Sequence, residues 1–185
     1  CVSAAVKTYL EKQMWWGTDK LVTVYKGHDL AWYQQPAADL GALKLPAGAF
    51  KVAMVANLRA HKGLHVLIAA THHLPDEAPI HILLVGPKPD DPAVLQAISK
   101  ARHPERIHVL GYRDDAPEVA AACDIIVLPT TKREGLARAV VEAMAYGRPA
   151  VISNSGGNAE LVADGESGFV VPVNDAKALA ERITK

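Results

Sequence analysis

The chain has 185 residues, which is enough for one well-buried domain and short for two. Half of the residues are hydrophobic, and 20 lysines and arginines balance 20 aspartates and glutamates, so the formal net charge is zero. This composition is typical of an ordinary globular protein and argues against a general nucleic-acid or membrane-surface binder, which usually carries a basic excess.

Only two cysteines are present, Cys1 and Cys123, and they lie far apart in the sequence. A disulfide framework is therefore not expected, and a reducing, cytoplasmic setting is favoured. No apolar run approaches the ~20 residues that span a bilayer, and no signal-peptide pattern is present. Because the chain begins with Cys and ends within the helical pattern of residues 179–185, we expect it to be a fragment of a longer protein.

The first 50 residues differ in character from the rest. The pattern predicts an amphipathic helix over Ser3–Met14 and a strand over Leu21–Tyr25 that ends at Gly27. Residues 34–48 are rich in Ala, Pro and Gly, which is typical of a loop.

From residue 50 onward, short apolar strands alternate with helices. Strands are predicted over residues 51–56, 80–85, 106–110, 124–128, 149–153 and 168–171. Helical stretches are predicted over 63–73, from Asp91-Pro92 onward, over 116–122, 135–146 and 158–163, and from Asn174-Asp175 onward, with Gly147 as a helix stop. Nearly continuous apolar strands, each followed by a helix, predict an α/β fold: a Rossmann-like, doubly wound parallel sheet of about six strands with helices on both faces.

Ligands of such sheets bind at the carboxyl ends of the strands. The loops to search are therefore residues 57–63, 86–91, 111–115, 129–136 and 153–158.

The most informative of these stretches contains Glu134, Gly135 and Glu142. A helix that starts here would direct its free N–H groups at a phosphate, and Gly135 would allow a close approach. If both glutamates lie on or near one helix, they are about 12 Å apart along its axis, roughly the span from a ribose past a diphosphate to a hexose. The simpler alternative is a capping Glu134 and a solvent-facing Glu142, and the spacing by itself favours that alternative.

The sequence around the two glutamates favours the ligand-binding role over the capping and solvent-facing alternative. Five segments follow one another in order: residues 121–129, 134–142, 145–152, 155–162 and 164–172. This string resembles the C-terminal domain of the family 4 glycosyltransferases, retaining GT-B enzymes with a motif of one glutamate, seven residues and a second glutamate. The resemblance runs from about Lys20 to the end of the chain.

The resemblance implies a nucleotide-sugar donor-binding domain over residues 19–185, after a helix (residues 1–18) from the region that precedes it. Glu134 would bind the sugar and Glu142 the ribose, while Lys62 with Arg59 would hold the diphosphate. The family usually has an arginine where this chain has Asn57, and Arg59 could replace it. Gly135, Leu136 and Ala137 would also contact the donor, and Tyr112 or Arg113 would lie at the nucleobase or simply form a surface loop.

We expect no metal or other cofactor, because basic side chains at a helix start can neutralise a diphosphate leaving group. The partners implied are a nucleoside diphosphate sugar and, through an N-terminal domain absent from this chain, an acceptor glycan or glycolipid. No nucleic acid is expected, and the full-length protein could associate peripherally with the inner face of the membrane. By itself, the 185-residue chain is expected to bind the donor and to transfer nothing.

Two alternatives stay open. One is a GT-B-type epimerase or phosphorylase, and the other is a non-enzymatic nucleotide-binding α/β module. No Gly-x-Gly-x-x-Gly follows the predicted strand at residues 51–56, which argues against a dinucleotide site. Residues 155–158 either lie against the sugar or form a tight turn, and Glu160 is expected to have a structural role.

Overall fold

A computed structural model describes residues 1–15, 17–57, 59–86 and 88–185. Leu58 and Pro87, which fall in two of the loops predicted to line a site, lie outside the described residues, as does Trp16. The described chain forms one six-stranded sheet in the order β3-β2-β1-β4-β5-β6, with every neighbouring pair parallel. Its strands are β1 (Phe50–Val55), β2 (Ile80–Val85), β3 (Ile107–Gly111), β4 (Ile125–Leu128), β5 (Ala150–Ser153) and β6 (Gly168–Val171). The predicted doubly wound sheet is confirmed.

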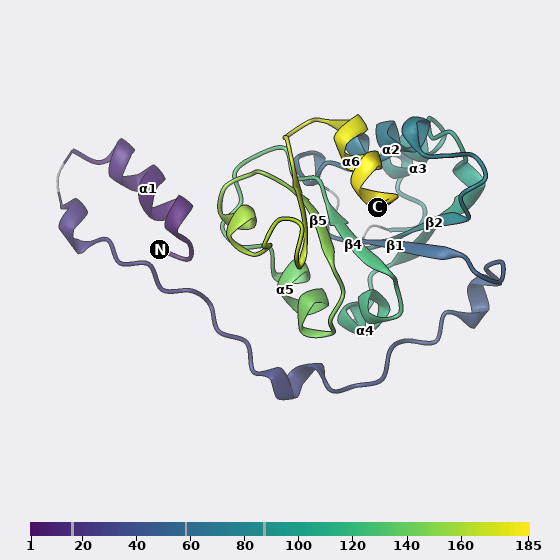
Figure 1. Cartoon of the computed structure of the whole chain (residues 1–185), viewed down its shortest axis with the longest axis horizontal. Helices are drawn as coiled ribbons and strands as arrows, with labels where there is room; N and C mark the ends of the chain where they lie inside the picture. Colours follow the sequence, from purple (N-terminus) through teal and green to yellow (C-terminus); the bar gives the residue numbers. More distant parts are fainter. Residues whose placement is uncertain (16, 58, 87) are drawn as a thin grey trace.

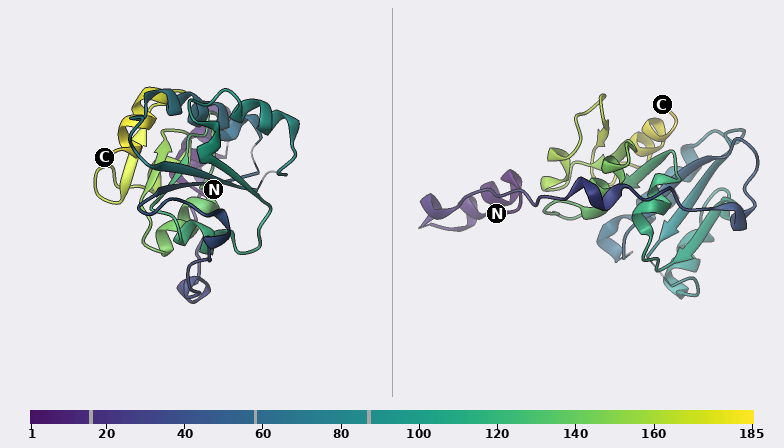
Figure 2. Two further views of the ribbon diagram at one scale, coloured as in Figure 1. Left: turned by 90° about the vertical axis from the view of Figure 1, so that its right-hand side faces the viewer. Right: turned by 90° about the horizontal axis from the view of Figure 1, so that it is seen from below.

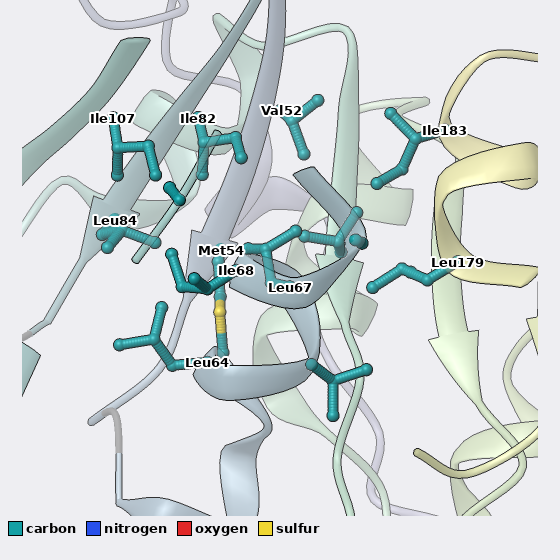
Figure 3. Close-up of a cluster of buried hydrophobic side chains, with 14 of the residues drawn as sticks. Val52, Met54, Leu64, Leu67, Ile68, Ile82, Leu84, Ile107, Leu179 and Ile183 are labelled. Carbon is teal, nitrogen blue, oxygen red and sulfur yellow. The ribbon is translucent and has the colours of Figure 1, made fainter. Parts of the chain in front are cut away.

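Helices cover both faces of this sheet (Figure 1). On one face lie α2 (Leu64–Ala70), α3 (Pro92–Ile98) and α6 (Ala176–Ile183), and on the other lie α4 (Ala116–Ala121) and α5 (Arg138–Ala145). Alternate strand residues divide between the two faces because side chains alternate along a strand. Val52 and Met54 belong to the cluster that includes Leu67 and Leu179 (Figure 3), whereas Ala53 belongs to a separate cluster with Leu83.

Helix α5 is fixed by its packing against the sheet face that it covers together with α4. Val140 and Ala143 of α5 are fully buried against Ile126 and Ile152. The helix ends as predicted, with Gly147 in the left-handed region at φ 71°. Because one side of α5 is anchored in the core, its N-terminus is held at the carboxyl edge of the sheet.

The N-terminal arm, residues 1–15 and 17–25, lies to one side of the sheet (Figures 1 and 2). Its helix α1 (Ala4–Gln13) is present as predicted, but none of its residues is buried. The predicted strand over Leu21–Tyr25 is wrong: these residues are extended without belonging to the sheet, and their backbone bonds run between Val22, Val24 and Cys1. A β-prone run becomes a strand only beside another strand, and the described chain provides none there.

The carboxylate of Glu160 is one of the groups that attach this arm to the rest of the protein. Glu160, at the end of the 3-10 turn η7 (Gly157–Glu160), accepts hydrogen bonds from the backbone N–H groups of Ala4 at 2.9 Å and Ala5 at 2.7 Å. It also accepts one from the Tyr25 hydroxyl at 2.8 Å. These amides are at the start of α1, where N–H groups lack partners within the helix and an anion is favourable. The structural role expected for Glu160 is confirmed.

We expect Glu160→Ala to release the start of α1. The protection factors of the Ala4 and Ala5 amides should fall roughly tenfold at neutral pH, as measured by NMR-detected hydrogen exchange. Burial raises the pKa of Glu160, but the amides of Ala5 and Ala4 and the Tyr25 hydroxyl outweigh it and hold this pKa below its usual 4.5. The docking energy is therefore complete above pH 4.5 and is lost as the pH falls through the lowered value. Glu166→Ala is the matched control, and unchanged protection in Glu160→Ala would contradict the anchoring role.

Candidate functional site

A cavity of about 600 Å³ opens at the carboxyl ends of β1 and β4. These strands are neighbours at the point where the order of the sheet reverses, which is where doubly wound folds bind ligands. Its walls come from the end of β1 (Val55 to Asn57), from Leu128 of β4, and from the segment between Glu134 and Glu142. The loop after β3 and the start of α4 close another side.

Most of the residues predicted from the sequence line this cavity. They are Asn57, Lys62, Tyr112, Arg113, Glu134, Leu136, Ala137 and Glu142. Two predicted residues do not line it: Arg59 is exposed on the surface, and Gly135 is partly buried close to Val2. The structure therefore joins residues that are up to 85 positions apart in the sequence, from Asn57 to Glu142, around one space.

Lys62 is held in place by contact between two loops. It ends the 3-10 turn η4 (Ala60–Lys62), and Gly63 follows at φ 83°. A Cβ atom on Gly63 would lie 1.9 Å from the carbonyl oxygen of Pro129, so the backbones touch directly there. The Thr131 N–H also donates to the His61 carbonyl at 2.8 Å. The loop after β1 is thus fixed to the loop after β4.

Lys62 and Glu134 form an ion pair inside the cavity. The Lys62 Nζ lies 2.5 Å from the Glu134 Oε1, and the two side chains are only 16% and 19% exposed. The Thr130 hydroxyl donates a longer bond of 3.4 Å to the Glu134 Oε2. The arrangement places a cation and a hydrogen-bond acceptor side by side, which suits a ligand that carries both an anionic group and hydroxyls.

The segment that carries Glu134 is not helical. The predicted helix start at Gly135 is wrong, because α5 begins at Arg138. Glu134 instead forms a β-bridge with Gly156, and its carbonyl accepts from the Gly157 N–H at 2.8 Å. The side chain of Asn158 accepts from the Ala137 N–H at 3.1 Å. These bonds hold the segment out of the helix, so the helix-axis estimate of the distance between the two glutamates does not apply, although both line the cavity.

The turn after β5 supports this segment, and sequence reasoning missed that role. A Cβ on Gly156 would lie 2.1 Å from the Glu134 carbonyl oxygen, and one on Gly157 would lie 1.9 Å from that of Gly135. Ser153 and Ser155 donate from their hydroxyls to the carbonyls of Thr130 and Lys132. Residues 155–158 therefore form a close-packed turn against residues 134–137. A Gly-Gly pair between Ser155 and Asn158 was the available signal for such an approach.

Glu142 is a buried carboxylate. It is 6% exposed, and its Oε1 accepts a bond of 2.5 Å from the Nε of Arg138, a residue not singled out from the sequence. This hydrogen bond raises the pKa of Arg138. Burial, and then the charge of Glu142, raise the pKa of Tyr33, which ends the 3-10 turn η2 (Leu30–Tyr33). The alternative of a capping Glu134 and a solvent-facing Glu142 is wrong: Ala137 is the N-cap of α5, and Glu142 is buried.

The remaining wall combines an aromatic ring with a guanidinium. Tyr112 lines the cavity and is 80% exposed. Arg113 donates two bonds to Asp115, at 2.7 Å from Nε and 2.6 Å from Nη2. The bond from Arg113 holds the pKa of Asp115 below its usual range. A fixed guanidinium beside an open ring can flank a flat, polar ligand group.

In the described part of the chain, no group of three His, Cys, Asp or Glu side chains is placed to hold a metal ion. None of the helices in this part is long and apolar enough to cross a membrane.

Comparison with known proteins gives a family match. The model of the family described as "Glycosyl transferases group 1" matches residues 38–185. The chain is 33% identical over 135 residues to the N,N'-diacetylbacillosaminyl-diphospho-undecaprenol alpha-1,3-N-acetylgalactosaminyltransferase of Campylobacter jejuni, covering 72% of this chain and 34% of that protein. It is 36% identical over 122 residues to the phosphatidyl-myo-inositol mannosyltransferase of Mycolicibacterium smegmatis, covering 64% of this chain and 31% of that protein.

Solved structures are consistent with this family match. HepE of Anabaena, in complex with UDP and glucose, superposes with a TM-score of 0.86 at 29% sequence identity, over 100% of this chain and 51% of that chain. The chain thus spans about half the length of this structural relative and about a third of the two transferases above.

Proposed function

Because the chain belongs to the family of group 1 glycosyl transferases, we propose that its cavity binds a nucleoside diphosphate sugar. We further propose that the whole protein transfers this sugar to an acceptor with retention at the anomeric carbon. The observation that carries the proposal is the pairing of Lys62 with Glu134 at 2.5 Å in the same cavity as the buried Glu142. The solved complexes of HepE with UDP and with UDP-glucose support it.

Each group has a chemical role in this proposal. The Lys62 ammonium and the first N–H groups of α5 face the diphosphate, whose charge grows as the bond to the sugar breaks. Glu134 accepts hydrogen bonds from sugar hydroxyls, and Glu142 accepts them from the ribose. The bond between the anomeric carbon and the diphosphate oxygen breaks while the acceptor oxygen attacks the same face. The acceptor proton passes to the departing phosphate.

We also assign further residues of the chain to the diphosphate and the nucleobase of the donor. Lys62 is the principal diphosphate cation, and Arg59, which is exposed and outside the cavity wall, remains a predicted second one. Tyr112 and Arg113 contact the nucleobase. No metal takes part. These assignments rest on the cavity lining and on the family resemblance.

The acceptor and the cellular setting are also proposals, because the chain spans only part of its relatives. The names of the two related transferases include a diphospho-undecaprenol and a phosphatidyl-myo-inositol, which favours a lipid-linked or glycan acceptor for this protein. We propose a cytoplasmic enzyme of polysaccharide or glycolipid synthesis that associates peripherally with the membrane. Both relatives are transferases by name, which favours transfer over the epimerase, phosphorylase and non-enzymatic alternatives.

Titration calorimetry with UDP, GDP, ADP and their glucose conjugates tests the donor site directly. We expect the chain to bind one nucleoside diphosphate in preference, and Glu142→Ala to weaken that binding about tenfold by removing a charged acceptor. Glu181→Ala, an exposed glutamate on α6, serves as the control. Equal affinity in the wild type and in Glu142→Ala, or no binding of any of these nucleotides, would refute the assignment.

A further inference from the structure

Arg138 and Glu142 form an ion pair in which one side chain is exposed to solvent and the other is buried. Both residues line the cavity, but the side chain of Arg138 is 72% exposed, whereas that of Glu142 is 8% exposed. The Arg138 Nε donates to the Glu142 Oε1 at 2.5 Å. An exposed guanidinium thus reaches inward to a buried carboxylate.

This pair is poorly placed to stabilise α5. Arg138 is the first residue of the helix, where the positive end of the dipole disfavours a cation. An arginine four residues before a glutamate is also the weaker order for a helical ion pair. Ala137 gives the helix no side-chain cap, and its first turn holds no acidic residue. The start of α5 therefore keeps its positive character, and the stability of the helix does not account for Arg138.

The bond fixes one oxygen of the carboxylate and leaves the other available. In the described part of the chain, the Glu142 Oε2 accepts no hydrogen bond, while Oε1 is held by Arg138. Tyr33, 9% exposed, lies close enough for the charge of Glu142 to act on it. A carboxylate has about four acceptor positions, so one bond from Arg138 leaves room for a pair of hydroxyl donors.

We propose that Arg138 is a positioning residue for nucleotide recognition: by holding the Oε1 of Glu142, it directs the carboxylate toward the vicinal hydroxyls of the ribose. The inference rests on the proposed function, in which Glu142 binds the ribose. The new element is that Arg138 determines how much the ribose hydroxyls contribute to the affinity for the nucleotide. Arg138 does not itself contact the nucleotide.

The test is a cycle that combines a protein change with a ligand change, measured by titration calorimetry. UDP is compared with 2′,3′-dideoxy-UDP on the wild type, Arg138→Met and Arg138→Lys, with circular dichroism as a check of folding. We expect Arg138→Met to bind UDP about tenfold more weakly and to bind the dideoxy ligand within about twofold of the wild type. Arg138→Lys should recover part of the loss. Lys7→Met removes a helical ion pair of the same spacing outside the cavity and is the matched control.

The outcomes separate this inference from the function on which it rests. Equal losses for both ligands would mean that Arg138 contacts the phosphate or base directly, and would overturn the proposal. Unchanged UDP binding in Arg138→Met would overturn it as well, even where Glu142→Ala still weakens UDP. If the wild type binds UDP, GDP and ADP without any dependence on Glu142, the proposed function itself fails.

Discussion

Replacing Lys62 by methionine is expected to weaken the binding of a nucleoside diphosphate on the order of 10- to 100-fold, because one charge-assisted bond to phosphate contributes roughly 1.5–3 kcal/mol. Lys62 is well placed for such a bond. Its ammonium lines the cavity, its side chain is 16% exposed, and the contact between Gly63 and Pro129 fixes the turn that presents it. Titration calorimetry with UDP measures the loss.

The same substitution is expected to lower stability, and the two effects can be separated. Without Lys62, the largely buried carboxylate of Glu134 keeps, among the described residues, only the 3.4 Å bond from Thr130. We expect the free energy of unfolding to fall by about 1–3 kcal/mol, which lowers Tm by several degrees. Adding Glu134→Gln removes the stranded charge, so the double variant should recover Tm without recovering affinity.

Lys100→Met is the control for this experiment, since Lys100 is an exposed lysine in the turn after α3. It should leave both affinity and Tm unchanged. Wild-type affinity in Lys62→Met would show that the diphosphate lies elsewhere. Recovery of wild-type affinity in the double variant would show that the loss came from the unpaired charge of Glu134 rather than from the missing cation.

The sheet was predictable because its signals are local. Each predicted strand from residue 50 onward matches an observed one to within one residue at either end, since apolar runs bounded by turn residues identify buried strands. Asp91 and Asp175 cap their helices with side-chain bonds, as expected from their positions before α3 and α6. The predicted strand at Leu21–Tyr25 failed because strand pairing depends on a neighbour that the local sequence does not specify.

Most residues that line the cavity were predictable, but its geometry was less so. Topology brings Lys62, Glu134 and Glu142 to one edge of the sheet, so a prediction from strand ends and family resemblance located them. The start of α5 was misplaced because bonds from Gly157 and Asn158, more than 20 residues downstream, hold residues 134–137 out of the helix. Arg138 was missed because an arginine in a predicted helix is expected to be a solvated surface residue. Its bond to Glu142 is visible only in the structure.

The largest effect on stability is expected for Gly63→Ala, and the chain contains a matched comparison for it. Gly63 and Gly165 both have φ +83°, so alanine at either position carries a backbone strain of about 1–2 kcal/mol. They differ in the space open to a Cβ atom. A Cβ at Gly165 meets nothing within 4 Å, whereas a Cβ at Gly63 would lie 1.9 Å from the Pro129 carbonyl oxygen and 2.7 Å from its carbonyl carbon.

Backbone must therefore move in Gly63→Ala, and that movement couples stability to function. We expect a loss of more than about 3 kcal/mol and a fall in Tm of about 10 °C for Gly63→Ala, against about 3 °C for Gly165→Ala, measured by thermal denaturation. Because Gly63 directly follows Lys62, separating the loops after β1 and β4 also displaces the ammonium from Glu134. UDP affinity should then fall in Gly63→Ala and stay at the wild-type level in Gly165→Ala. Equal changes in Tm for the two variants would mean that backbone strain alone decides the cost, and that the close approach of Gly63 to Pro129 is not what positions Lys62.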